Sequence, residues 1–272
     1  MTGTIDFSQS DQYTLSIRLS TDGFSFCVCP PQHPEDGCYR SYAVNPQRSM
    51  AANVKAFLAD TAELGHTFGQ TNLLIHSSRY TPVPFELFED EQMEAIFYQN
   101  LTRQNNEIVL CNVLGRSNLA ILFGMDKLTH LLLSERFAHA RFFAAVSPQV
   151  EWLSGRNRAG DRSRLYAHLH PNSTDVFCFE RGRLQLVNSY TTPTLDDRCY
   201  YLLNVWQQLG FDPEQDELHL TGLRNLCTAL EEQLRPYLRN IDIMNPSTHF
   251  RTTAAGVSGE VPFDIQSLLI CE

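Results

Sequence analysis

Two histidines alternate with a leucine in the stretch HLHPNSTD, which runs from His168 through His170 to Asp175. Side chains two positions apart on a β-strand point to the same side of the sheet, so the two imidazoles could bind one metal ion. A zinc site needs three or four ligands, however, and two histidines do not complete one. The alternative, two ordinary residues of a half-buried strand, is favoured, and we predict no metal site.

Cysteines are the second set of side chains with reactive chemistry. Cys27 and Cys29 alternate as the histidines do, and the alternative of a half-buried strand applies to them as well. Cys178 lies between two phenylalanines, which predicts a buried, inert thiol rather than a nucleophile. The sequence contains neither a G-x-S-x-G motif nor the P-loop motif G-x-x-x-x-G-K-[ST]. We therefore predict no catalytic residue.

The composition is that of an ordinary globular protein, with 43% hydrophobic and 19% charged residues in a chain of 272. A formal net charge of −10 argues against nucleic-acid binding, which requires a basic surface. Of the 21 basic residues only two, Lys55 and Lys127, are lysines. This preference for arginine suits a protein-binding surface, and genomic base composition would explain it equally well.

Three features of the sequence bear on cellular location. The first residues lack the basic start and apolar stretch of a secretory signal. No run of about 18 apolar residues could form a membrane-spanning helix. The eight cysteines follow no disulfide framework. We expect a cytoplasmic protein with reduced thiols and no membrane insertion.

The elements that must position these residues occur twice along the chain. Alternating apolar runs on either side of a Thr-Asp-Gly turn predict a β-hairpin over residues 13–30. Segments with helical spacing and single strands follow, which predicts an α/β fold. The polar stretch 154–163 separates this half from a similar one, so the chain shows a weak duplication at roughly 150 residues. The strands expected at the start of the second half are 164–170, 175–180 and 183–190.

The first hairpin of each half resembles a phosphate-binding motif in which two residues have been replaced. In two-lobed nucleotide-binding proteins this hairpin reads hydrophobic-Asp-x-Gly-x-x-x-Thr/Ser-hydrophobic. The glycine lets the backbone approach a phosphate, and the aspartate organises Mg²⁺ or the attacking water. In LSIRLSTDGFSFCV, Arg18 stands at the aspartate position and Ser20 at the glycine position. His168 and His170 occupy the same two positions in the second half.

The stretch LHLTGLRNL is similar to the strand-turn-helix element that holds adenosine in these proteins. That element reads hydrophobic-x-hydrophobic-Thr/Ser-Gly-Gly, and here Thr221 and Gly222 are followed by Leu223, so the second glycine is lost. Through these stretches, together with YTLSIRLSTDGFSFCV and FERGRLQLVNSY, the whole chain resembles the actin-like ATPase (ribonuclease-H-like) class. More narrowly, it resembles an uncharacterised Bacteroidetes family of unknown function with a degenerate form of that fold.

The resemblance implies a duplicated α/β fold of two lobes, each with a mixed sheet and flanking helices. The first lobe is expected over residues 1–155 and the second over 156–272, with the C-terminal segment packing back on the first. The resemblance also implies a degenerate nucleotide crevice between the lobes. Its expected lining residues are Arg18, Ser20, His168, His170, Ser173, Thr174, Thr221 and Gly222.

A crevice without its aspartates is consistent with two functions. The first is a non-catalytic scaffold or adaptor, a pseudo-ATPase that binds a protein partner; the resemblance points here to the cytoplasmic actin-like parts of pilus and secretion machines. The second is a nucleotide-binding regulator or weak ATPase that holds ATP or ADP. We favour the first, because Arg18 cannot bind Mg²⁺ and His168 leaves no evident general base. We therefore expect no resident cofactor and no ATP hydrolysis. An enzyme with chemistry unrelated to ATP is the third hypothesis.

Overall fold

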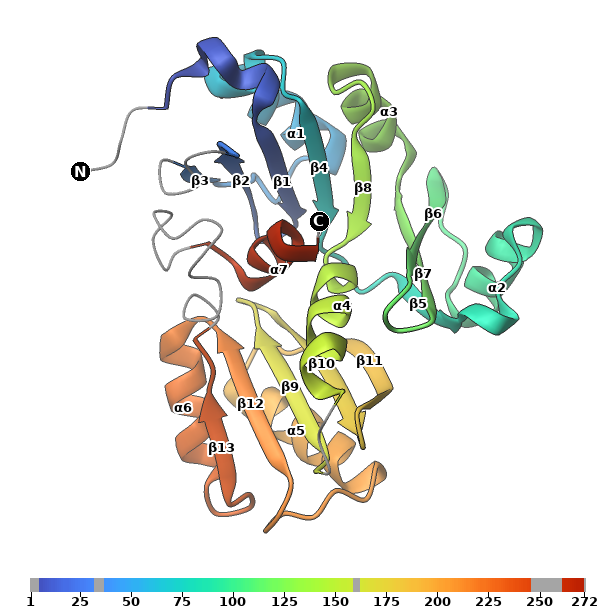
Figure 1. The fold of residues 1–272 in the computed structure, drawn as a ribbon, viewed down its shortest axis with the longest axis vertical. Coiled ribbons are helices and arrows are strands. Elements are labelled where there is room, and N and C mark those ends of the chain that lie inside the picture. The colour runs from blue at the N-terminus through green and yellow to red at the C-terminus, as the bar shows by residue number, and fades with distance from the viewer. Residues whose placement is uncertain (1–4, 32–36, 159–161, 246–260, 272) are drawn as a thin grey trace. The chain divides into compact units, whose positions relative to one another are not determined.

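The computed structural model describes residues 5–31, 37–158, 162–245 and 261–271 (Figure 1). They divide into two compact units. Unit 1 comprises the chain up to Pro148 together with residues 250–270, and unit 2 comprises Gln149–His249. Each unit has its own five-stranded mixed sheet, so the fold is the α/β type that the sequence predicts. No helix within the described ranges is long and apolar enough to cross a membrane.

The five-stranded sheet of unit 1 consists of β1 (Thr14–Ser20), β2 (Gly23–Cys29), β3 (Cys38–Tyr42), β4 (Gln70–Ile75) and β8 (Arg141–Ala144). β1 and β2 form the predicted antiparallel hairpin, and the Ser20 hydroxyl accepts a hydrogen bond from the Asp22 amide in its turn at 3.2 Å. β4 pairs parallel with β1, and β8 with β4. The strand order is therefore β3-β2-β1-β4-β8.

Alternation along the first hairpin gives the sheet of unit 1 two different faces. One face carries the main core of the unit, in which Phe57 of α1 (Met50–Asp60) packs against Phe24 with ring centroids 5.5 Å apart. The other face carries Cys27 and Cys29, which pack against Ile265 of α7 (Phe263–Cys271). The hairpin residues of the first face are Leu15, Ile17, Leu19, Phe24, Phe26 and Val28.

Unit 1 also contains a three-stranded antiparallel sheet of β5 (Tyr80–Pro84), β6 (Glu107–Leu114) and β7 (Leu119–Asp126). β5 carries two prolines and lies at the edge of this sheet, where a missing backbone N–H costs no ladder bond. Asp126 caps the following helix by accepting a hydrogen bond from the Thr129 amide at 2.7 Å. The remaining helical elements of the unit are α2 (Met93–Asn100), α3 (Lys127–Arg136), and the 3₁₀ segments η1 (Phe7–Gln12), η3 (Ala62–Gly65), η4 (Phe85–Leu87) and η5 (Asp90–Gln92).

Unit 2 repeats the larger sheet with β9 (Arg164–Leu169), β10 (Ser173–Glu180), β11 (Arg183–Thr191), β12 (Glu217–Gly222) and β13 (Asn240–Ile243). Its helices are α4 (Val146–Asn157), which leads into the unit, α5 (Leu195–Gln208) and α6 (Arg224–Leu234). α5 starts with a capping box, in which Thr194 and Asp197 bond reciprocally. The apolar sides of α5 and α6 pack on one face of the sheet, with Trp206 and Leu230 in the core.

The structure confirms the duplication that the sequence indicated. The order β11-β10-β9-β12-β13 of unit 2 matches that of unit 1 strand for strand, with the same parallel and antiparallel pairs. In the first hairpin of each unit, Arg18 pairs with Ser25 and His168 pairs with Asp175. β1, which carries Arg18, and β9, which carries His168, are therefore structurally equivalent strands. Arg18 and His168 occupy corresponding positions in them.

Candidate functional site

Arg18 forms a buried ion pair in unit 1. β1 directs its side chain to the face that α7 covers, and the residue is 8% exposed. Its Nε donates a hydrogen bond to Oδ2 of Asp264 at 2.5 Å, and that carboxylate is fully buried. The sequence predicted Arg18 as a neighbour of phosphate, whereas in unit 1 its guanidinium binds a carboxylate of its own chain.

Ser20, at the former glycine position of the first hairpin, also bonds within unit 1. Its hydroxyl caps the turn through the Asp22 amide and lies 3.2 Å from Nδ1 of His76, which directly follows β4. Ser16, on the same face of β1 and two residues before Arg18, is fully buried, and its hydroxyl has no hydrogen-bond partner among the described residues. This face of β1 is thus polar, and residues of unit 1 supply hydrogen-bond partners to Arg18 and Ser20.

In unit 2 a row of polar side chains crosses the sheet at the level of His168. Thr221 of β12 and Asp175 of β10 are its register partners on either side, and Ser189 of β11 is the partner of Asp175. Thr221, His168 and Asp175 are buried. His170 lies on the same side as His168, with ring centroids 4.3 Å apart, as alternation on one strand predicts.

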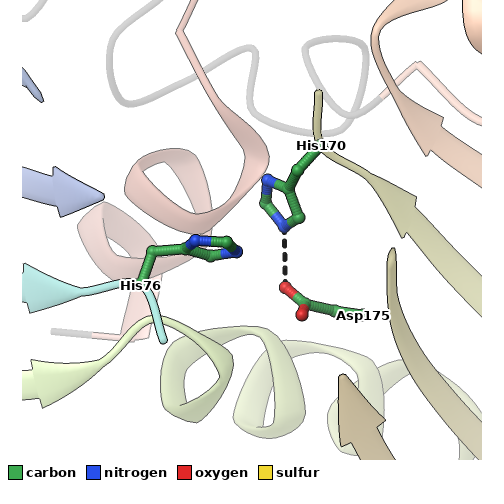
Figure 2. A group of neighbouring side chains, drawn as sticks. All are labelled: His76, His170 and Asp175. Atoms are coloured by element: carbon green, nitrogen blue, oxygen red, sulfur yellow. Dashed lines mark hydrogen bonds and ion pairs between the residues drawn. The ribbon is translucent and has the colours of Figure 1, made fainter. Parts of the chain in front are cut away.

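The Asp175 carboxylate is engaged at both oxygens by residues of unit 2. Figure 2 shows the hydrogen bond between His170 Nε2 and Asp175 Oδ2, which spans 2.7 Å. The hydroxyl of Ser189 donates to the other oxygen, Oδ1, at 2.5 Å. Asp175 is only 1% exposed, so these bonds offset the cost of burying its charge. Both oxygens of this carboxylate therefore already accept a hydrogen bond from within unit 2.

Arg198 of α5 organises the turn that follows His170, and the sequence analysis missed it. The residue is 1% exposed, and burial lowers the pKa of its guanidinium. It donates hydrogen bonds of 2.9–3.0 Å to the carbonyl oxygens of His170, Pro171 and Ser173 and to the Thr174 hydroxyl. Because these partners are mostly backbone atoms, no residue type in the turn signals them. Through these hydrogen bonds Arg198 therefore fixes the conformation of the turn between β9 and β10.

Thr221 and Gly222 end β12, and the structure gives each a local role. Gly222 has φ +113, and an added Cβ would lie 2.2 Å from the carbonyl oxygen of Leu169, so only glycine fits beside β9. The buried hydroxyl oxygens of Thr221 and Ser173 have no hydrogen-bond partner within the described part of the chain. Both lie at the edge of the sheet where β9 and β12 end, the edge at which α/β sheets bind ligands.

The predicted crevice residues therefore form two groups, one in each unit. Arg18 and Ser20 lie together on the α7-covered face of unit 1. The six others gather around the β9–β10 turn and the end of β12 in unit 2. Their joint role in nucleotide binding stays a prediction. Asp264, like Arg198, was not found by sequence reasoning, because 246 positions separate it from Arg18.

Comparison with known proteins gives a family and a fold. The model of the family described as "Protein of unknown function (DUF3822)" matches residues 2–241. A crystal structure from Bacteroides thetaiotaomicron, described as a protein with actin-like ATPase fold and unknown function, is 40% identical, with a TM-score of 0.87. The match covers 99% of this chain and 100% of that one.

More distant structures are similar over most of their length. One is described as a PilM-PilN type IV pilus biogenesis complex, with 13% identity, TM-score 0.49 and 94% of each chain covered. Another is an AlfA filament bound to AMPPNP, with 11% identity, TM-score 0.41 and 94% of each chain covered. These two likenesses do not bear on function. None of the curated proteins matches the chain.

Proposed function

The chain belongs to the DUF3822 family, and from that premise we propose that it is a non-catalytic actin-like scaffold, a pseudo-ATPase that binds a protein partner. Its fold is that of the actin-like ATPases, as in the related Bacteroides structure. The observation that carries the proposal is the buried ion pair of Arg18 with Asp264. It places a neutralised cation where hydrolysing members of the fold need a carboxylate.

Hydrolysis of ATP needs Mg²⁺ held by oxygen ligands and a group that orients the attacking water. At the two equivalent motif positions this chain has Arg18 and His168, neither of which binds Mg²⁺ as a carboxylate does. The nearest carboxylate in unit 2, Asp175, already accepts hydrogen bonds from His170 and Ser189. Catalysis is therefore unsupported in both units, although their sheets and cores are complete.

A protein partner is supported by apolar side chains on the surface of the helices. Leu128 and Leu131 of α3 are 55% and 52% exposed and lie three residues apart, on one side of the helix. In unit 2, Tyr200 of α5 and Tyr237 are also more than half exposed. Exposed aromatic and aliphatic side chains are the groups that protein interfaces bury.

The test measures both turnover and binding of nucleotide on the intact protein. Phosphate release from Mg-ATP should not exceed the rate in buffer, and saturating ATP or ADP should leave the melting temperature unchanged. A ligand at a hundred times its Kd would stabilise the folded state by about 2.7 kcal/mol, which a thermal shift detects readily. Turnover that Arg18→Ala abolishes would refute the pseudo-ATPase proposal.

A nucleotide-binding regulator is the second candidate, and one observation favours it. The buried hydroxyls of Ser173 and Thr221 lack partners within the described residues, and a bound ligand would satisfy them. Under this candidate, ATP or ADP raises the melting temperature of the natural protein. The variants Ser173→Ala and Thr221→Val lose that shift, whereas Thr228→Val, on the exposed side of α6, retains it. The absence of any shift would exclude this candidate.

A further inference from the structure

A cluster of arginines lies at one end of unit 2, and the proposed function assigns it no role. Arg156 and Arg158 lie at and just after the end of α4. Arg181 and Arg183 flank Gly182 in the turn between β10 and β11. The two segments are adjacent, because a Cβ added at Gly182 would lie 3.4 Å from the carbonyl oxygen of Arg158. Four guanidinium groups thus project from neighbouring parts of the backbone.

These four arginines are exposed, and none forms an ion pair with a carboxylate of the described residues. Arg162 and Arg164, close by in sequence, differ because both are paired with Glu217. Arg156 stacks over the ring of Trp152 at 4.7 Å, which orders its guanidinium before any partner arrives. The chain as a whole has net charge −10, so this group of cations without ion pairs to the described residues runs against its overall charge.

The stability of the fold explains the presence of arginine at only two of the four positions, Arg156 and Arg158. Cations at the C-terminal end of a helix interact favourably with its dipole, which suffices for Arg156 and Arg158. Arg181 has φ +48 and Gly182 has φ +78, the positive values that a two-residue type I′ hairpin turn requires. Among residues with a side chain, asparagine best tolerates the first of these positions, so arginine there reduces stability rather than adding to it.

We propose that the basic edge of unit 2, defined by Arg156, Arg158, Arg181 and Arg183, docks an acidic segment of the protein partner. The inference rests on the proposed function for the existence of a partner, and on these arginines for its chemistry. Guanidinium groups bind carboxylates in bidentate geometry. A long nucleic acid would extend past the cluster over a protein of net charge −10, so a short carboxylate-rich segment fits better.

The test measures fluorescence anisotropy of a labelled peptide of alternating glutamate and serine, with a glutamine–serine peptide of equal length as the neutral control. The double variant Arg181→Asn/Arg183→Gln should weaken binding of the acidic peptide about tenfold. Its matched control, Arg235→Gln/Arg239→Gln, removes the same two charges from exposed positions elsewhere in unit 2. That control should change the affinity by less than about twofold.

A single substitution separates docking from folding. Arg181→Asn should leave the melting temperature unchanged or raise it, because asparagine suits the left-handed conformation, and it should still weaken peptide binding. Loss of stability together with binding would overturn the proposal, since Arg181 would then serve the turn. So would equal weakening in the control double variant, or no binding of the acidic peptide at all.

Two further outcomes distinguish failure of the docking proposal from failure of the pseudo-ATPase proposal. If single-stranded DNA bound more tightly than the peptide and lost its affinity in the same double variant, the basic edge would be a nucleic-acid surface and the proposal would fall. If the protein hydrolysed Mg-ATP but still bound the peptide through these arginines, the pseudo-ATPase function would fall and the docking site would stand.

Discussion

Replacing Asp264 with asparagine would remove the carboxylate that the Nε of Arg18 binds. The Arg18 side chain is 10% exposed and that of Asp264 is 0% exposed, so little water can reach the guanidinium in its place. Removing one partner of a buried pair typically costs about 3–5 kcal/mol, whereas replacing both with apolar residues of similar size is near neutral. We therefore expect Asp264→Asn and Arg18→Met to destabilise unit 1 strongly, and Arg18→Met/Asp264→Leu to recover most of the loss.

The assay is urea and thermal unfolding followed by far-ultraviolet circular dichroism. Tryptophan fluorescence would not serve, because Trp152 and Trp206 both belong to unit 2 and would not report on unit 1. A loss of 3–5 kcal/mol should lower Tm by roughly 6–20 °C for a protein of this size. Glu94→Gln is the matched control, because it breaks an exposed pair with Arg103 and should cost less than about 1 kcal/mol.

The reasoning would be refuted by either of two results. One is a cost for Asp264→Asn no larger than that of Glu94→Gln, which would mean that the Arg18 pair is solvated. The other is a double variant as unstable as the sum of its two single variants, which would mean that the two side chains act independently. Either result would also remove the observation on which the pseudo-ATPase proposal rests.

Three other predictions concern residues away from this pair. Arg198→Met should cost about 2–4 kcal/mol in urea unfolding, because it leaves one buried and two part-buried carbonyl groups of the β9–β10 turn without this donor. Burial raises the pKa of Glu217, but hydrogen bonds from Arg164 and His219 outweigh it and leave the pKa lowered. Its stabilisation is therefore present above about pH 4.5 and lost as pH falls, so Glu217→Gln should flatten the acid limb of a stability–pH curve. Burial raises the pKa of Cys111 to about 11, so this half-buried thiol should react with a disulfide reagent at neutral pH far more slowly than a free thiol.

Local patterns in the sequence were enough to predict the hairpins and the α/β class. Alternating apolar residues around the Thr-Asp-Gly turn gave the first hairpin, and the same pattern near His168 gave the second. The recurrence of this pattern indicated a weak duplication, and the resemblance to the actin-like class implied the two lobes with mixed sheets. These features depend on neighbours in sequence, which is why they could be read without a structure.

The partners of the candidate site residues could not be predicted in the same way. Asp264 meets Arg18 only because α7 returns to the sheet of unit 1 after most of the chain has intervened. Arg198 bonds to backbone carbonyls, which carry no residue-specific signal. Gly222 was interpreted as a nucleotide-binding residue, whereas its lack of a side chain is already required by the close approach of Leu169. Long-range contacts and backbone contacts therefore decide the chemistry of these positions.

The two units satisfy the buried polar face of their first hairpin with different residues. Each keeps a hairpin whose polar face would, in a nucleotide-binding relative, be satisfied by phosphate and metal. Buried polar groups without partners are costly, so a hairpin that folds without such a ligand needs partners from its own chain. Unit 1 supplies Asp264 to Arg18, and unit 2 supplies His170 and Ser189 to Asp175. These bonds satisfy part of each polar face without a ligand, as the pseudo-ATPase proposal requires.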